Sequence, residues 1–450
     1  MDRSIFGRRN WDTNRNLLDR FVAPREAISE ARRRQSWHSS WDDHTDNDNQ
    51  ETSFGQKFKK KKYTNHLEKA FDFEPRLRKN PYKHLIRPWP CNPRKKSHLS
   101  SADSILDLPS YSYAAFPELV DWNSDNIMVA ALGHKYHKWS WDSQNSVGAG
   151  FTRYTVRCCK FDPRGDLLLL GTDGFLETIE MHDNSLNKLI AKGVCPWDES
   201  HICSITAADW SPTGNSFAVG CSWGSVASFT RDVTKISKRQ LGKEAILLVR
   251  VSPDARHLAV TEMNSDSVKL LTWPSLDILS NNRTGSTIRT MTWHPWRSAL
   301  LGIGSVTADL EPQITLWNVP SCEFEKLNMG TKRQSLDAML FSRRTGELVL
   351  SLWCSDTAIL HPKLCSHLIV MSDLETVVDV WGEGRSGLGR VRTMVFSPDG
   401  TKLATATSDE DLIIWNFLPE EKNAKKVKRN KQFSTLPVLL DQANHGFSLR

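Results

Sequence analysis

Ser222 lies in the stretch GCSWG, which has the glycine spacing of a nucleophile elbow. In such an elbow a strand turns sharply into a helix, and the exposed serine hydroxyl attacks the substrate. The residues that follow, SVASF at 225–229, alternate in polarity as a strand does. We therefore expect a turn between two strands, and a serine hydrolase remains the enzymatic alternative.

Three glycines, Gly382, Gly384 and Gly387, have the GxGxxG spacing of loops that bind dinucleotide phosphates. Such a loop must open a helix, because the backbone N–H groups at the helix N-terminus bind the pyrophosphate. Here the next residues, RVRTMVF at 390–396, have the pattern of a strand. This predicts a loop between structural repeats, and we expect no nucleotide cofactor.

The stretch HPKLCSH offers His361, Cys365 and His367 as metal ligands. A zinc site needs about four ligands, and the sequence shows no second group of matching spacing. The nine cysteines form no CxxC pair, which suits a reducing compartment and not a disulfide framework. We therefore expect no metal and no cofactor, and a binding protein in place of an enzyme.

The 450-residue chain is long enough to bury a sizeable core, since 39% of its residues are hydrophobic. It has no apolar run of about 18 residues that would span a membrane, and its first residues lack the apolar segment of a secretory signal. We expect an intracellular protein of the nucleus and cytoplasm that does not associate with membranes.

The net charge of +7 is unevenly distributed along the chain. Residues 1–105 carry +9 and residues 419–450 carry +4, whereas residues 106–418 carry −6. The basic stretches KFKKKK (57–62) and KNAKKVKRNK (422–431) have the composition of nuclear-import signals or nucleic-acid contacts. We favour import signals over nucleic acid as a partner, because no aromatic stacking module accompanies them.

A repeated unit organises the centre of the chain. Each copy has a short apolar strand that ends in an aromatic residue or valine, then a turn and further strands of alternating polarity. The spacings between these anchor residues are 39, 49, 41, 42, 48 and 55, as in propeller blades. The anchors are Trp122, Phe161, Trp210, Val251, Trp293, Phe341 and Phe396.

The repeats predict an all-β fold, a seven-bladed WD-repeat β-propeller, with three strands per repeat and the fourth supplied across the blade boundary. Two copies end in a Trp-Asn pair, at Trp317 and Trp415, where WD repeats usually have Trp-Asp. The last copy lacks an outer strand, and an open ring would leave sheet edges unpaired. We expect residues 104–116 to close the ring, which would bring Asp107 near Glu410.

The composition then divides the chain into three parts. Residues 1–103 form a basic arm expected to be disordered, residues 104–418 form the propeller, and residues 419–450 form a basic tail. The arm contains one compact cluster of charged and apolar residues, DRFVAPR at 19–25.

This cluster resembles the C-box of the Fizzy and Fizzy-related family, the WD-repeat activators of the anaphase-promoting complex, which is a ubiquitin ligase. The family pattern is Asp-Arg-Phe/Tyr-Ile-Pro-x-Arg, and the proline here stands one place late, at Pro24. The matching residues are Asp19, Arg20, Phe21, Val22 and Arg25.

Two further stretches extend the resemblance to most of the chain. The sequence ILDLP at 105–109 resembles Ile-Leu-Asp-Ala-Pro of the family, and the final Leu449-Arg450 resembles its terminal Ile-Arg. The resemblance implies that the C-box and the final dipeptide dock on ligase subunits while the propeller presents substrates such as cyclins. It also implies checkpoint inhibitors as partners.

The family binds two degrons, the destruction box (Arg-x-x-Leu) and the KEN box. By resemblance, Asp107 and Glu410 would hold the destruction-box arginine and Leu106 would line its leucine pocket. The KEN site would use Arg390 and Ser305, with the asparagine of the family falling at Met263 or, after a one-residue shift, at Asn264.

The blades depart from the family consensus, which indicates a specialised member similar to the insect cortex proteins, associated with female meiosis. We therefore expect a substrate-recruiting activator of the ligase in the mitotic or meiotic cell cycle. The alternative is a WD-repeat scaffold in RNA processing or chromatin, whose basic tails contact nucleic acid and whose affinity falls steeply with salt.

Overall fold

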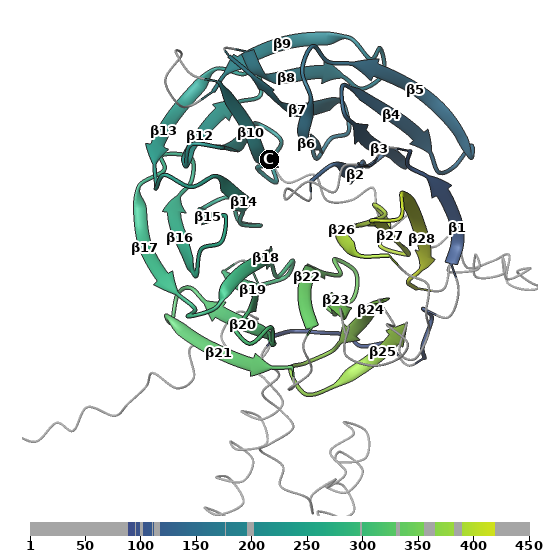
Figure 1. Ribbon diagram of the computed structural model, residues 1–450, viewed down its shortest axis with the longest axis vertical. Helices are drawn as coiled ribbons and strands as arrows, with labels where there is room; N and C mark the ends of the chain where they lie inside the picture. Colours follow the sequence, from purple (N-terminus) through teal and green to yellow (C-terminus); the bar gives the residue numbers. More distant parts are fainter. Residues whose placement is uncertain are drawn as a thin grey trace, which may run out of the picture. The chain divides into compact units, whose positions relative to one another are not determined.

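The computed structural model describes residues 89–94, 96–99, 102–109, 111, 118–175, 177–195, 202–297, 299–329, 334–354, 365–381 and 389–418. The regular elements there are β-strands, which form seven four-stranded antiparallel blades around a ring (Figure 1). The predicted all-β seven-bladed propeller is therefore confirmed. Within the described ranges, no helix has the length and apolarity needed to cross a membrane.

The first four blades follow one another along the chain, each running from its innermost to its outermost strand. They comprise β2 (Val120–Trp122), β3 (Ile127–Leu132), β4 (Lys135–Ser140) and β5 (Asn145–Phe151); β6 (Val156–Phe161), β7 (Leu167–Gly174), β8 (Glu177–Asp183) and β9 (Leu189–Val194); β10 (Cys203–Trp210), β11 (Ser216–Cys221), β12 (Ser225–Thr230) and β13 (Lys235–Gln240); and β14 (Ile246–Val251), β15 (His257–Glu262), β16 (Ser267–Thr272) and β17 (Ile278–Arg283).

The last three blades complete the ring, and the seventh includes a strand from the beginning of the described chain. They comprise β18 (Thr287–Trp293), β19 (Leu300–Val306), β20 (Pro312–Asn318) and β21 (Glu323–Asn328); β22 (Gln334–Phe341), β23 (Leu348–Cys354), β24 (Cys365–Met371) and β25 (Val377–Trp381); and β26 (Val391–Phe396), β27 (Lys402–Thr407), β28 (Asp411–Asn416) and β1 (Ala102–Asp107).

The predicted sharing of strands between blades is wrong for six of the seven. Blades one to six each consist of four consecutive strands, because the chain completes a blade before it moves to the next. Only the seventh takes its outer strand from elsewhere: β1 pairs antiparallel with β28. This pairing closes the ring.

Each predicted anchor is the last residue of the innermost strand of its blade. Inner strands are sandwiched between neighbouring blades, so they are apolar at consecutive positions, as in β3, where four adjacent residues are buried. Outer strands have only one covered face, and the burial of β17 accordingly alternates. The periodicity that marked the repeats therefore reflects the depth of each strand in the ring.

Hydrogen bonds join the innermost strands of neighbouring blades. The backbone N–H of Phe161 in blade two donates to Asp121 Oδ2 in blade one at 2.8 Å. In the same way, the backbone N–H of Val251 in blade four donates to Asp209 Oδ2 in blade three at 2.8 Å. These contacts satisfy backbone donors between sheets, where no ladder exists to pair them.

Residues 89–94 and 96–99, which we call the strap, pack against blades five to seven. Trp89 is fully buried and contacts the anchor Phe341 of blade six edge to face, with ring centroids 5.7 Å apart. Further along, Leu99 is 1% exposed in the core cluster between blades six and seven. The predicted disordered arm therefore ends too late at residue 103, because it includes this buried strap.

Arg94 is the centre of the contacts made by the strap. Its guanidinium donates to Glu347 Oε2 at 2.7 Å, to Asp379 Oδ2 at 3.2 Å and to the carbonyl oxygen of Phe417 at 2.9 Å. The side chains of Arg94, Glu347 and Asp379 are at most 2% exposed. Burial opposes ionisation of Asp379, but hydrogen bonds from His98, Ser97 and Leu99 hold its pKa below the ordinary value.

We predict that Arg94→Ala lowers the free energy of unfolding by about 3–5 kcal/mol, because it leaves two buried carboxylates without their cation. Arg157→Ala is the matched control: its pair with Asp173 is partly exposed, so its loss costs up to about 1 kcal/mol. Urea unfolding of both variants measures the difference. Equal losses would show that the strap does not stabilise the ring.

Candidate functional site

Strand direction puts all the sequence-predicted peptide contacts of the propeller on one face. Successive strands of a blade are antiparallel, so the turn after the second strand lies on the same face as the start of the first strand. We call this the top face. It includes Glu410 between β27 and β28, Asn264 between β15 and β16, Arg390 just before β26, and the ends of β1 and β19, where Asp107 and Ser305 lie.

The closing strand brings Asp107 and Glu410 together. In the β1–β28 pairing, Leu106 lies opposite Leu412 and Asp107 opposite Asp411. The next residue along, Leu108, donates its backbone N–H to the carbonyl oxygen of Glu410 at 2.6 Å. Two acids far apart in sequence thus become neighbours at the joint of blades seven and one.

Burial alternates along β1, so that Ala102, Ser104 and Leu106 are half-buried and Asp103, Ile105 and Asp107 are exposed. Leu106 is half-buried and packs on the core cluster that joins blades seven and one, which includes Trp122 and Leu412. Asp107 and Glu410 are exposed. The joint therefore presents exposed carboxylates to solvent, and half-buried Leu106 covers the core cluster there.

Glu410 has a left-handed backbone conformation, with φ of 66°. The equivalent turns of blades one, three, four and five have Gly133, Gly224, Asn264 and Leu310 at positive φ. Glycine adopts this conformation without strain, whereas a residue with a side chain pays about 1–2 kcal/mol. The backbone therefore gives no reason for a glutamate at this position.

Arg390 is already engaged within the protein. Its Nε donates to Asp337 Oδ2 at 2.6 Å and its Nη2 to Asp337 Oδ1 at 2.7 Å, a bidentate pair across blades seven and six. Its Nη2 also lies 3.3 Å from the hydroxyl of Ser335. A glutamate from a peptide would have to share this guanidinium with Asp337.

The other two residues predicted for the KEN site differ in accessibility. Ser305 is 0% exposed, and its hydroxyl has no hydrogen-bond partner among the described residues. Asn264 is exposed at the tip of its turn, with φ of 54°. The role of Ser305 in peptide binding stays a prediction, and it would require this buried hydroxyl to become accessible.

The sequences that resembled enzyme motifs have ordinary structural surroundings where they are described. Ser222 is followed by the strand β12, and its Oγ accepts the backbone N–H of Ser204 at 3.2 Å. The GxGxxG glycines and His361 lie outside the described residues, but the strand β26 follows the glycine loop as predicted. His367 lies within β24, opposite Leu352 of β23.

The residues predicted to dock on a ligase lie outside the described part of the chain. They are Asp19, Arg20, Phe21, Val22, Arg25, Leu449 and Arg450. Their roles stay predictions.

Sequence reasoning missed a group of charges that lines the inside of the ring. The residues just before the first four anchors alternate in charge: Asp121, Lys160, Asp209 and Arg250. Buried Glu118 joins them through an ion pair with Arg250. Burial raises the pKa of Asp209 to about 6 against the opposing effect of Arg250 and Lys160. The alternation is visible in the sequence and indicates that these charges hold blades one to four together.

The chain is similar to known WD-repeat proteins in sequence. The model of the WD domain, G-beta repeat family matches residues 383–416, which include most of blade seven. The chain is 61% identical to protein cortex of Heliconius erato over the whole of both chains. It is 25% identical to Protein FIZZY-RELATED 1 of Arabidopsis thaliana, over 76% of this chain and 67% of that protein.

A solved structure shares the fold. A chain of the crystal structure of the mitotic checkpoint complex aligns with a TM-score of 0.56 and 19% identity, over 71% of this chain and 96% of that chain. At this identity the likeness concerns the fold alone, and the sequence relatives decide the family. The chain belongs to the cortex proteins, a branch of the Fizzy and Fizzy-related family of WD-repeat proteins.

Proposed function

We propose that this protein recruits substrates to the anaphase-promoting complex and that its top face binds the destruction box, Arg-x-x-Leu. One observation carries the proposal: the closing strand holds Asp107 beside Glu410 at the joint of blades seven and one. Membership of the Fizzy and Fizzy-related family supports it. The protein would act by binding, not by catalysis.

The acidic joint suits the arginine of the degron. A guanidinium has five donors in a planar fork, so two converging carboxylates accept from it together, whereas a lysine ammonium presents a single compact charge. Asp409 of the same turn and Asp411, the first residue of β28, flank Glu410 and add to the negative potential there. We therefore expect arginine to be preferred over lysine.

Half-buried Leu106 would line the pocket for the leucine of the degron. Leu106 and Leu412 are paired across β1 and β28, and both belong to the cluster that joins blades seven and one. Burial of a leucine side chain against such a surface stabilises a complex by about 1.5–3 kcal/mol. The arginine and leucine contacts together would orient the peptide along the joint.

The KEN box would bind more weakly. Asp337 occupies the guanidinium of Arg390, and the hydroxyl of Ser305 is buried. A peptide glutamate would therefore gain little at Arg390 unless Asp337 moved. This favours a narrowed substrate range, restricted to proteins with a destruction box.

Docking on the ligase would use the two ends of the chain. Residues 19–25 and the final Leu449-Arg450 have the residue types of the family's ligase-binding motifs. Two weak motifs on one chain bind more tightly than either alone, because the first contact raises the effective concentration of the second. The basic stretches support action in the nucleus as well as the cytoplasm.

We predict that Glu410→Lys abolishes most binding of an Arg-x-x-Leu peptide, because it replaces an acceptor with a like charge. A peptide with glutamate in place of the arginine should regain part of the affinity for this variant, up to about 1 kcal/mol. Titration of full-length protein measures both, and circular dichroism checks folding. If Glu410→Lys and Asp107→Ala both bind like the parent, the receptor lies elsewhere.

We predict that Glu410→Gly weakens peptide binding without lowering stability. Glycine removes the carboxylate and relieves the left-handed strain, so the free energy of unfolding should stay unchanged or rise by up to about 1 kcal/mol. Leu310→Gly, in the equivalent turn of blade five, is the matched control. It should change stability in the same direction and leave peptide affinity intact; a similar loss of affinity in both variants would contradict a specific role for Glu410.

We predict that Arg20→Ala weakens co-purification with the ligase, at a cost of about 1.5–3 kcal/mol if its charged hydrogen bonds are buried in the complex. Deletion of residues 19–25 should abolish co-purification, and removal of Leu449 and Arg450 should reduce it while peptide binding persists. Arg32→Ala, in the same basic arm, controls for charge alone. Equal recovery of ligase subunits with all variants would exclude docking through these motifs.

A further inference from the structure

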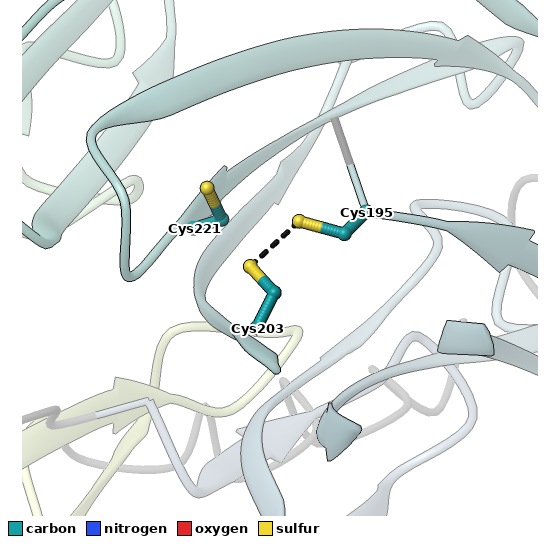
Figure 2. A group of neighbouring side chains, drawn as sticks. All are labelled: Cys195, Cys203 and Cys221. Atoms are coloured by element: carbon teal, nitrogen blue, oxygen red, sulfur yellow. Dashed lines mark hydrogen bonds between the residues drawn. The ribbon is translucent and has the colours of Figure 1, made fainter. Parts of the chain in front are cut away.

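Three buried cysteines lie together where blade two passes to blade three. Cys195 directly follows β9, Cys203 begins β10 and Cys221 ends β11. Figure 2 shows the three side chains side by side, and their sulfur atoms all lie within 4.8 Å of one another. Sequence spacing gave no sign of this group, because the cysteines come from three separate strand ends.

Packing alone does not account for the group. Cys158 belongs to the same core cluster and shows how an isolated buried cysteine is accommodated, with its thiol 3.7 Å from the carbonyl oxygen of Ile205. In contrast, the sulfurs of Cys195 and Cys203 are 2.7 Å apart. Nonbonded carbon atoms in a core usually stay about 3.5–4.0 Å apart, and sulfur is larger than carbon, so this contact is closer than apolar packing gives.

A disulfide would use only two of the three sulfurs. A metal ion would use all of them: zinc binds thiolates at about 2.3 Å, which puts the sulfurs of a tetrahedral site about 3.8 Å apart. The observed sulfur distances, from 2.7 Å to at most 4.8 Å, lie on both sides of this value. Small side-chain rotations would therefore bring three thiolates into a zinc coordination sphere.

One side-chain hydroxyl beside the group, that of Ser222, can donate a hydrogen bond to a thiolate ligand. The hydroxyl of Ser222 lies 3.7 Å from the sulfur of Cys203. Such outer contacts orient ligands and stabilise their negative charge.

Solvent comes close to the group at Ser222. Ser222 is only half-buried, whereas the three cysteines are buried. A water molecule beside Ser222 would complete a tetrahedral site with three protein ligands. We propose that Cys195, Cys203 and Cys221 bind one zinc ion, with water in the fourth position.

The ion would fasten a specific joint of the ring. β10 of blade three continues the sheet of blade two through Cys203 opposite Gly174 and Ser204 opposite Asp173. At the same place, zinc would tie the end of β9 to the start of β10 and to the end of β11. Blades two and three would then behave as one unit, independently of any peptide at the joint of blades seven and one.

The test is the zinc content of the full-length protein, purified under reducing conditions and measured by elemental mass spectrometry. We expect about one ion per chain, and replacement by Co²⁺ should give the charge-transfer absorption of cobalt thiolates. Removal of zinc by a strong chelator should lower the unfolding temperature. Cys203→Ser should lose the metal, and Cys158→Ala, in the same core cluster, should keep it.

The parent protein alone can overturn the proposal, so it does not depend on whether Cys203→Ser folds. Folded parent protein that contains no zinc and gives no cobalt–thiolate absorption would exclude the site. A Cys195–Cys203 disulfide found in that protein by mass spectrometry would exclude it as well. Copper in place of zinc would overturn the choice of metal, and equal metal loss in Cys158→Ala would contradict the three named ligands.

Discussion

The antiparallel pairing of β1 with β28 is the contact on which the ring depends. Without it, blade seven would have three strands and an open edge, and an open edge is a site of aggregation. The same pairing completes the core cluster in which Val120 and Trp122 of blade one meet Ile414 of blade seven. One strand thus closes both the hydrogen-bonded sheet and the apolar contact between the first and last blades.

The strap, which precedes β1 in the chain, stabilises this closure. Arg94 lies between Glu347 of blade six and the end of β28, and its guanidinium also stacks on the ring of Phe417 at 3.9 Å. Because only two residues separate Leu99 of the strap from Ala102 of β1, the contacts of the strap limit where the closing strand can begin. A buried ion pair of this kind contributes little net stability but costs much when broken, so it acts as a specific fastening for one arrangement of the chain.

The sequence predicted what depends on local pattern and missed what depends on distant partners. The seven anchors and the strand periodicity follow from burial between blades, and all seven anchors fall at the ends of innermost strands. In the sequence the strap looked like part of a polar arm, because the partner that buries Arg94, Glu347, is 253 residues away. The sequence also could not show that Ser305 is buried, that Asp337 engages Arg390, or that three irregularly spaced cysteines meet.

Closure of the ring and substrate binding are thermodynamically linked if the proposed receptor is correct. A peptide held by Asp107 of β1 and Glu410 of blade seven contacts both sides of the closing joint, so it binds the closed ring and not the open one. A ligand with that preference stabilises the closed form by about 2.7 kcal/mol at one hundred times its dissociation constant. By the same linkage, any loosening of the strap raises the concentration of peptide needed for binding. The burial of Arg94, on the opposite side of blade seven from Glu410, is therefore part of what keeps the receptor formed.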